Sequence, residues 1–263
     1  MRYFRLIGQF MRASFQEEAA YRSNFFISLL HSLLNLGTGV LGLSVIFGQV
    51  ESVRGWSYAA TLALLGVYLT VSALRGLFIG PGLEALSGMD GEIWSGSFDF
   101  TALRPVNIQF YISLRKWRWF SLFDLLLGLG VLGLAMARLG QSLNLVQVLT
   151  FLLALAAGVF TLYAILLAFA GLVFWSPEVL FTWIFNGVFQ MARYPVGLYP
   201  GWLRLVMTWI VPVGIMTTVP AQALTGDLPA GALIGSIALA LAFLAGATTL
   251  FRTGLRRYAS ASS

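Results

Sequence analysis

The stretch RYPVGLYPGWLRLVMTWIVPVGIMTTVPAQALTG, which runs from Arg193 to Gly226, is apolar enough to enter a lipid bilayer. It also contains prolines, at Pro195, Pro200, Pro212 and Pro220. Proline lacks a backbone donor and clashes with the preceding helical turn, so this stretch fits a straight membrane helix poorly. Irregular backbone at membrane depth persists only where protein or a water-filled cavity surrounds it. The stretch therefore predicts a broken, re-entrant element on a transport path rather than a passive anchor.

The composition around this stretch indicates a multi-pass membrane protein. The 263 residues are 59% hydrophobic and 10% charged, with a mean hydropathy of +0.84, whereas soluble domains carry roughly 25% charged residues. The net charge of +6 fits arginines in short cytoplasmic loops, and we expect no nucleic-acid partner. The chain contains no cysteine, which excludes disulfides and thiolate metal sites.

Apolar runs of about 20 residues predict membrane-spanning helices on both sides of the broken stretch. We predict an all-α fold with six transmembrane helices in a single transmembrane domain, 1–263. Residues 1–23 carry apolar side chains at helical spacing against arginines, which predicts an amphipathic helix along the cytoplasmic interface. The predicted spans are 24–50, 57–79, 120–137, 145–175, 178–191 and 230–251, with a cytoplasmic loop at 80–119 and the re-entrant segment at 193–226.

Arginine placement decides between six and seven spans. If the broken stretch crossed the membrane completely, seven spans would put the termini on opposite sides and the tail RTGLRRY outside. If the stretch re-enters, six spans put both termini in the cytoplasm and leave only Arg54, Arg138, Arg193 and Arg204 outside. Because short cytoplasmic loops are enriched in lysine and arginine, we predict six spans with the re-entrant segment at the outer face.

The loop at 80–119 combines acidic side chains, aromatic side chains and glycines. Exposed aromatics between acids are typical of a docking surface for a soluble partner. A solvated connector whose aromatics rest on the membrane interface explains the same composition, and the two interpretations remain open. The side chains concerned are Glu84, Asp90, Glu92, Trp94, Phe98, Asp99 and Phe100.

Motifs of the common enzyme classes are missing from the sequence. An ATPase site needs a glycine-rich loop that ends in a lysine, and the only lysine, Lys116 in RKWRW, follows no such loop. Zinc hydrolysis needs clustered histidine and carboxylate ligands, but His31 is the single histidine. We therefore expect a transport protein that is not an enzyme and has no catalytic residue, metal site or cofactor of its own.

Three polar residues fall within the predicted spans or at their ends. We expect His31 to pack within the bundle, Asp124 to pair with Arg115 or Arg118 or lie at the interface, and Arg75 to snorkel to the interface. The bundle is otherwise expected to be apolar and without buried charge. A stand-alone ion-coupled carrier is the alternative to a driven transporter, and it requires a functional Asp124 or His31.

Three stretches together are similar to one known family. They are GSFDFTALRPVN (Gly96–Asn107), YPVGLYP (Tyr194–Pro200) with VPVGIMTTVPAQALTG (Val211–Gly226), and FRTGLRRYASAS (Phe251–Ser262). In their order and spacing they resemble the six-span permease subunits of ABC exporters of the ABC-2 type, in a bacterial branch described as "ABC-2 family transporter protein". The resemblance covers nearly the whole chain.

This resemblance implies a function and a set of partners. Such permeases form dimers with an identical or related protomer, and each docks on a cytoplasmic ABC ATPase, which binds ATP and Mg. The chain would lie in the bacterial cytoplasmic (inner) membrane, among its lipids, and export a hydrophobic or amphipathic cargo such as a lipid, drug, natural product or glycolipid. The resemblance assigns ATPase coupling to Glu84, Asp90, Glu92, Trp94, Phe98, Asp99, Leu103, Arg104 and Pro105. It assigns the outer gate to Tyr194, Pro195, Tyr199, Pro200, Pro212 and Pro220.

Overall fold

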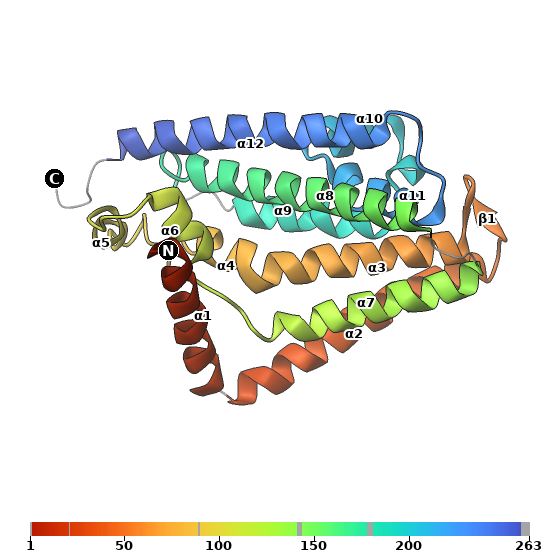
Figure 1. Ribbon diagram of the computed structural model, residues 1–263, viewed down its shortest axis with the longest axis horizontal. Helices are drawn as coiled ribbons and strands as arrows, with labels where there is room; N and C mark the ends of the chain where they lie inside the picture. The colour runs from red at the N-terminus through yellow and green to blue at the C-terminus, as the bar shows by residue number, and fades with distance from the viewer. Residues whose placement is uncertain (1, 21, 89, 141–143, 178–180, 259–263) are drawn as a thin grey trace.

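The computed structural model is a bundle of α-helices that run along one long axis (Figure 1). It describes residues 2–20, 22–88, 90–140, 144–177 and 181–258. Among these, five helices are long and apolar enough to cross a bilayer, and a bent pair forms an additional candidate. The predicted fold class, an all-α multi-pass membrane protein, is therefore confirmed. The five are α2 (Arg22–Phe47), α3 (Tyr58–Leu74) with its continuation, α7 (Ser121–Leu139), α8 (Leu145–Leu172) and α12 (Ala232–Arg257).

The bundle has two different ends (Figure 1). At one, β1 (Ser52–Val53) and β2 (Trp56–Ser57) form an antiparallel hairpin between α2 and α3; we call this the hairpin end. At the other lie α5 (Phe98–Ala102) and α6 (Ile108–Leu114); we call this the α5 end.

The N-terminal helix α1 (Arg2–Ala20) lies across the bundle axis at the α5 end (Figure 1). Its Glu18 carboxylate accepts a hydrogen bond from the backbone N–H of Trp119 (2.7 Å). The Trp119 indole donates to the carbonyl of Met11 (3.1 Å). These two bonds fasten α1 to the start of α7.

Local sequence signals determine where several long helices begin and end. Ser57 caps α3, because its hydroxyl accepts the Ala60 N–H (3.2 Å). Asn144 and Gln147 form a capping box at the start of α8, with bonds of 2.7 and 3.2 Å. Gly140 ends α7 with φ of +62°, a conformation that favours glycine.

Two glycines allow the backbone of α8 to lie in direct contact with the backbone of two other segments. A Cβ added at Gly171 would lie 3.0 Å from the Cα of Phe251 in α12. A Cβ added at Gly158 would lie 2.9 Å from the Cα of Met216 in the broken stretch. Since membrane helices gain stability from close packing rather than from excluding water, these contacts help to hold the bundle together.

The predicted span at 178–191 corresponds to the short helix α9 (Phe181–Gln190); residues 178–180 lie outside the described residues. Ten residues rise about 15 Å, half the thickness of a bilayer core. The chain still passes from one end of the bundle to the other here. The Thr182 hydroxyl is 3.5 Å from that of Ser87, next to α4 at the α5 end, whereas Gly197 accepts a hydrogen bond from Arg54 in the hairpin.

The broken stretch starts and finishes at the hairpin end. It comprises the 3₁₀ turns η2 (Met191–Arg193) and η3 (Val196–Leu198), then a pair of helical segments bent by 77°. Its last residue, Gly226, lies against Gln147 at the start of α8. Its middle reaches Gly158, 11 residues or about 17 Å further along α8. The segments of the pair are α10 (Gly201–Leu205) with η4 (Val206–Ile210), and η5 (Gly214–Thr218) with α11 (Val219–Thr225).

The prolines of this stretch lie where a missing backbone donor is tolerated. Pro195 precedes η3, and Pro200 is the residue before α10. Pro212 lies in the break between the two helical segments, and Pro220 lies in the first turn of α11. These positions explain how so many prolines fit within an apolar helical segment.

Substitution of Gly158 tests the backbone contact between α8 and the broken stretch. We expect Gly158→Leu to lower the thermal midpoint of the purified protein, because the new side chain overlaps the backbone of Met216 and overpacking costs about 1–3 kcal/mol or more. The matched control is Gly133→Leu in α7, which is exposed and has no atom within 4 Å of its added Cβ. Equal midpoints for the two variants would contradict the close approach.

Candidate functional site

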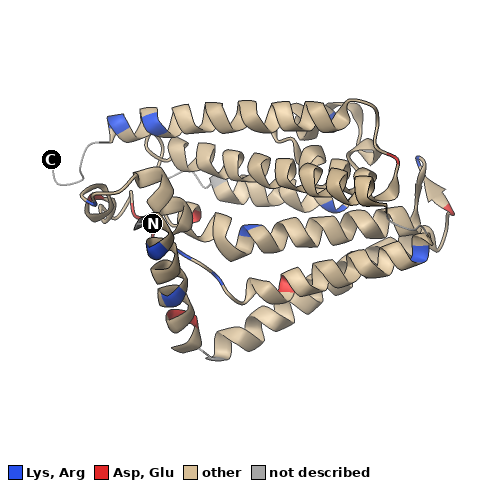
Figure 2. Cartoon of the chain, in the orientation of Figure 1, with Lys and Arg blue, Asp and Glu red and all other residues tan. Residues whose placement is uncertain are grey.

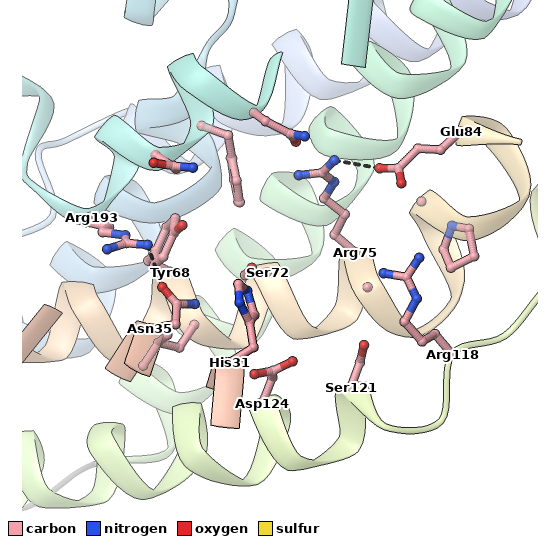
Figure 3. Close-up of a pocket in the computed structure, with 17 residues that line it drawn as sticks. His31, Asn35, Tyr68, Ser72, Arg75, Glu84, Arg118, Ser121, Asp124 and Arg193 are labelled. Atoms are coloured by element: carbon pink, nitrogen blue, oxygen red, sulfur yellow. Dashed lines mark hydrogen bonds and ion pairs between the residues drawn. The ribbon is translucent and has the colours of Figure 1, made fainter. Parts of the chain in front are cut away.

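A polar cavity of about 380 Å³ lies inside the bundle, between α2, α3, the start of α7 and α9 (Figure 3). Its volume is within the range of ligand-binding pockets in proteins. Nine of its lining side chains carry a charge, an imidazole or an amide: His31 and Asn35 on α2, Arg75 on η1, Glu84 on α4, Arg118 before α7, Asp124 on α7, Asn186 and Gln190 on α9, and Arg193 in η2. The rest of the lining is Tyr68, Leu69, Ser72, Gly76, Gly80, Pro81, Ser121 and Phe189. The expectation of a bundle without buried charge is wrong at this place.

Pro81, on one wall of the cavity, frees a backbone carbonyl that positions Arg118 on another wall. α3 continues through the π-helical turn η1 (Arg75–Ile79) into α4 (Gly80–Glu84), which contains Pro81. Pro81 has no N–H for the carbonyl of Leu77, four residues earlier. That carbonyl instead accepts the backbone N–H of Arg118 (2.8 Å). The bond fixes the chain before α7 where the Arg118 side chain lines the cavity (Figure 3).

Arg75 is held in the cavity wall by a carboxylate and by aromatic rings. Its guanidinium forms an ion pair with Glu84 (2.5 Å) and lies 5.0 Å from the ring centre of Phe185. The Arg75 side chain is 14% exposed. The prediction that Arg75 snorkels to the membrane interface is therefore wrong, because its charge is neutralised within the protein.

Arg193 enters the cavity from the broken stretch (Figure 3). Its guanidinium donates to the side-chain oxygen of Asn35, at the midpoint of α2, and lies 5.2 Å from the ring centre of Tyr68. The sequence placed Arg193 among the outer-loop arginines, but the side chain turns into the bundle instead. Within the described part of the chain Arg193 has no carboxylate partner, and its Nε is buried without a hydrogen bond. The side-chain oxygen of Asn186 is also buried and unpartnered.

Asp124 and His31 face the same cavity from α7 and α2 (Figure 3). The prediction of an ion pair between Asp124 and a nearby arginine is wrong. Arg115 pairs instead with Glu92 (2.6 Å), and neither ion pair found among the described residues includes Asp124. The cavity thus brings together the candidate proton carriers of the sequence with three arginines that the sequence assigned to interfaces and loops.

The loop at 80–119 folds into a compact element around α5. Phe98 is fully buried and packs edge-on against Phe174, beyond α8, and Tyr258, beyond α12, with ring centres 5.4 and 5.0 Å apart. The Tyr258 hydroxyl donates to the Asp99 carboxylate (2.9 Å). Burial, followed by this hydrogen bond, raises the pKa of Tyr258 to about 12, so the hydroxyl remains a donor at neutral pH. We call Phe98, Phe174 and Tyr258 the Phe98 cage.

The side chains assigned to ATPase coupling separate into internal and exposed groups. Glu84 and Glu92 form the ion pairs described above, and the guanidinium of Arg104 lies 4.8 Å from the ring centre of Tyr111. The expectation that Phe98 is an exposed aromatic is wrong, because the cage encloses it. The exposed members are Asp90, Trp94, Leu103, Arg104 and Pro105, and Phe100 of the same loop is exposed too; Phe100 and Leu103 are 75% and 82% exposed.

Four of the side chains assigned to the gate, Tyr194, Pro195, Tyr199 and Pro200, lie at the hairpin end of the broken stretch, whereas Pro212 and Pro220 lie in and after its break. The Tyr199 hydroxyl donates to the carbonyl of Met191 (2.7 Å), and Tyr194 lies against Gly42 of α2. Arg204 donates to the Gly197 carbonyl (2.8 Å), which also accepts from Arg54. Pro195 and Pro200 flank the turn that these bonds hold.

The comparison with family models identifies the class. Residues 33–262 match the family described as "ABC-2 family transporter protein", so the chain belongs to this family of ABC transporter permeases. The predicted resemblance is confirmed, and the protein is a multi-pass transport subunit of a membrane. No curated protein matches the sequence significantly.

Truncation of Phe98 tests whether the cage holds α5 to the bundle. We expect Phe98→Ala to lower the thermal midpoint by about 10 °C, since loss of a buried phenylalanine costs about 3–5 kcal/mol. The control is Phe100→Ala, two residues away and 75% exposed, which should leave the midpoint nearly unchanged. An unchanged midpoint for Phe98→Ala would exclude the cage as a support of α5.

Proposed function

We propose that this chain is the permease subunit of an ATP-driven exporter that moves a hydrophobic or amphipathic cargo out of a bacterial cytoplasm. A separate ABC ATPase binds ATP and Mg, and two permease protomers, identical or related, enclose the path. The observation that carries the proposal is α5, a short helix at the end of the bundle with exposed apolar side chains on its outside and the Phe98 cage on its inside. The membership of the chain in a family of ABC transporter permeases supports the proposal.

The α5 helix is the docking element for the ATPase. Phe100 and Leu103 project from it, and exposed apolar side chains of this kind are typical of contact sites for a partner. Asp90 and Trp94 extend the same loop. The solvated-connector interpretation explains exposed polar groups, but it gives no reason for a fully buried phenylalanine that fastens the helix to two long spans.

Movement of α5 reaches the outer side through packed contacts. The Phe98 cage joins α5 to the ends of α8 and α12. α8 in turn touches the backbone of the broken stretch at Gly158. When the ATPase subunits close, α8 and α12 shift as rigid bodies and move the broken stretch, which forms the outer gate.

The charge distribution supports a cytoplasmic α5 end. Figure 2 shows basic residues, all of them arginines, on α1 and on the last turns of α12, both at this end. Arg54, Arg138 and Arg204 lie at the hairpin end. Since cytoplasmic segments are rich in basic residues, both ends of the chain are on the cytoplasmic side and the broken stretch opens outward.

The first, second and fifth spans form the cargo path. Their residues line the polar cavity, and α2 carries exposed apolar side chains beside it, including Leu30 (59% exposed) and Leu34 (58%). A polar cavity next to an apolar helix face suits an amphipathic molecule at the junction of two protomers.

A stand-alone ion-coupled carrier is the second candidate function, because Asp124 and His31 both line the cavity. The two functions differ in what drives transport. The carrier requires Asp124 and works without an ATPase, whereas the exporter stops when ATP hydrolysis by the partner is blocked.

Association with the ATPase tests the proposed function. The tagged chain, solubilised in mild detergent, should retain an ABC ATPase encoded beside it. We expect the double variant Phe100→Ala, Leu103→Ala to reduce recovery of the ATPase at least about tenfold, since each apolar anchor contributes more than about 1 kcal/mol. Phe4→Ala, which removes an 82% exposed aromatic from α1, is the control and should change recovery little. Failure of the unmodified chain to bring down any ATPase would reject the exporter.

Cysteine labelling tests the membrane orientation. The chain has no cysteine, so a single substitution can be read without background. We expect Gly201→Cys, which is exposed with free space around its Cβ, to react with an impermeant reagent added outside intact cells. Leu103→Cys, on the opposite end, should react only after the membrane is opened. The reverse pattern would place α5 outside and remove the docking role.

A further inference from the structure

Three arginines line the polar cavity at successive depths (Figure 3). Arg118 lies just before α7 at the α5 end, and Arg75 lies in η1. Arg193 lies deepest, where it reaches Asn35, about 20 Å along α2 from its start. The three arginines are therefore spread from the α5 end to the middle of the bundle, and Glu84 neutralises the charge of Arg75.

Aromatic rings support two of these guanidinium groups, those of Arg75 and Arg193. Tyr68, which supports Arg193, packs against Phe189 with ring centres 5.3 Å apart. Phe189 stacks on Phe185 (5.4 Å), and Phe185 supports Arg75. A ring face orients a guanidinium by attraction to the ring's electrons but leaves its charge uncancelled. The row of rings thus orients both guanidinium groups, but Glu84 neutralises the charge of Arg75, so only the charge of Arg193 stays uncancelled.

The charge of Arg193 is not compensated by the described chain. Its contacts are an amide and a ring, and its Nε is buried without a hydrogen bond. A charge removed from water without an ionic partner is costly. The cavity as a whole carries three arginines against the carboxylates of Glu84 and Asp124, and Glu84 is already paired.

We infer that the Arg193 end of this cavity binds an oxyanion group, a phosphate or carboxylate, of an amphipathic cargo. The planar guanidinium matches the geometry of such groups, and an anion there would complete both the charge and the hydrogen bonds of Arg193. The exposed apolar face of α2 beside the cavity would receive the cargo's apolar part. That the bound molecule is a transported cargo rests on the proposed function, whereas binding of the anion to the chain does not depend on that function.

Ligand-dependent stability of the full chain in neutral detergent tests the site. The protein is titrated separately with dioleoyl phosphatidic acid, with dioleoylglycerol and with inorganic phosphate, and the thermal midpoint is followed. We expect phosphatidic acid to raise the midpoint and dioleoylglycerol, which lacks the phosphate, to leave it unchanged. A rise with inorganic phosphate of the same size would support the oxyanion site and assign it to a soluble anion.

Three substitutions locate the effect. Arg193→Gln should weaken the apparent affinity for phosphatidic acid about tenfold or more, the loss expected for a charge-assisted hydrogen bond. Asn35→Asp keeps the side-chain size but supplies Arg193 with an internal carboxylate, so it should raise the midpoint without ligand and abolish the response to phosphatidic acid. Arg138→Gln is the matched control, because Arg138 lies 5.2 Å over the ring of Tyr58 at the hairpin end, outside the cavity.

Two results would overturn the inference. One is equal stabilisation by phosphatidic acid and dioleoylglycerol, which would mean that the phosphate is not recognised. The other is an equal loss of affinity in Arg138→Gln and Arg193→Gln, which would mean that surface charge attracts the lipid. Because these measurements use the permease alone, they are independent of the ATPase association that tests the transport function.

Discussion

Lipid offers no hydrogen bonds, so every polar group at membrane depth in this chain needs a partner supplied by protein or by a wet cavity. Prolines and helix breaks sharpen this constraint, because they leave backbone carbonyls without their usual helical partners. The Leu77 carbonyl left by Pro81 takes the backbone N–H of Arg118. Near Pro212 and Pro220 the Thr217 hydroxyl, fully buried, donates to the carbonyl of Ala192 (3.0 Å). Hydrogen bonds at the breaks in the helices thus connect segments that are separate in the sequence.

The same constraint governs charge. The charges of Arg75 and Arg115 are neutralised by Glu84 and Glu92. Both ion pairs stabilise the loop at 80–119, which contains the proposed docking helix α5. Arg193 is treated differently, because a ring and an amide orient it and no described carboxylate cancels it. A protein that only needed a stable bundle would gain little from this arrangement. We therefore interpret the difference between paired and unpaired arginines as a separation of structural from ligand-binding roles.

Much of the architecture was predictable from apolar runs and turn residues. The span predicted at 57–79 overlaps α3 with η1, and the run at 120–137 overlaps α7. Side-chain environments were far less predictable. Phe98 and Phe100 are two residues apart in the same short polar segment, yet one is fully buried and the other 75% exposed. Nothing in the local sequence indicates this, because Phe98 is enclosed by Phe174 and Tyr258, which are remote in the chain.

The cavity was missed for a related reason. Each of its polar residues, taken alone, had an ordinary explanation as a packed histidine, an interfacial acid or a loop arginine, and the signal was their number across separate spans. The sequence by itself determined that the chain is an all-α membrane protein with a broken segment before its last span, because hydrophobicity and proline act locally along the chain. Only the tertiary structure decided that Arg193 turns inward to Asn35 and that Arg75, Glu84, Asp124 and His31 share one space, because ion pairs and ring contacts depend on segments far apart in sequence meeting at the same depth.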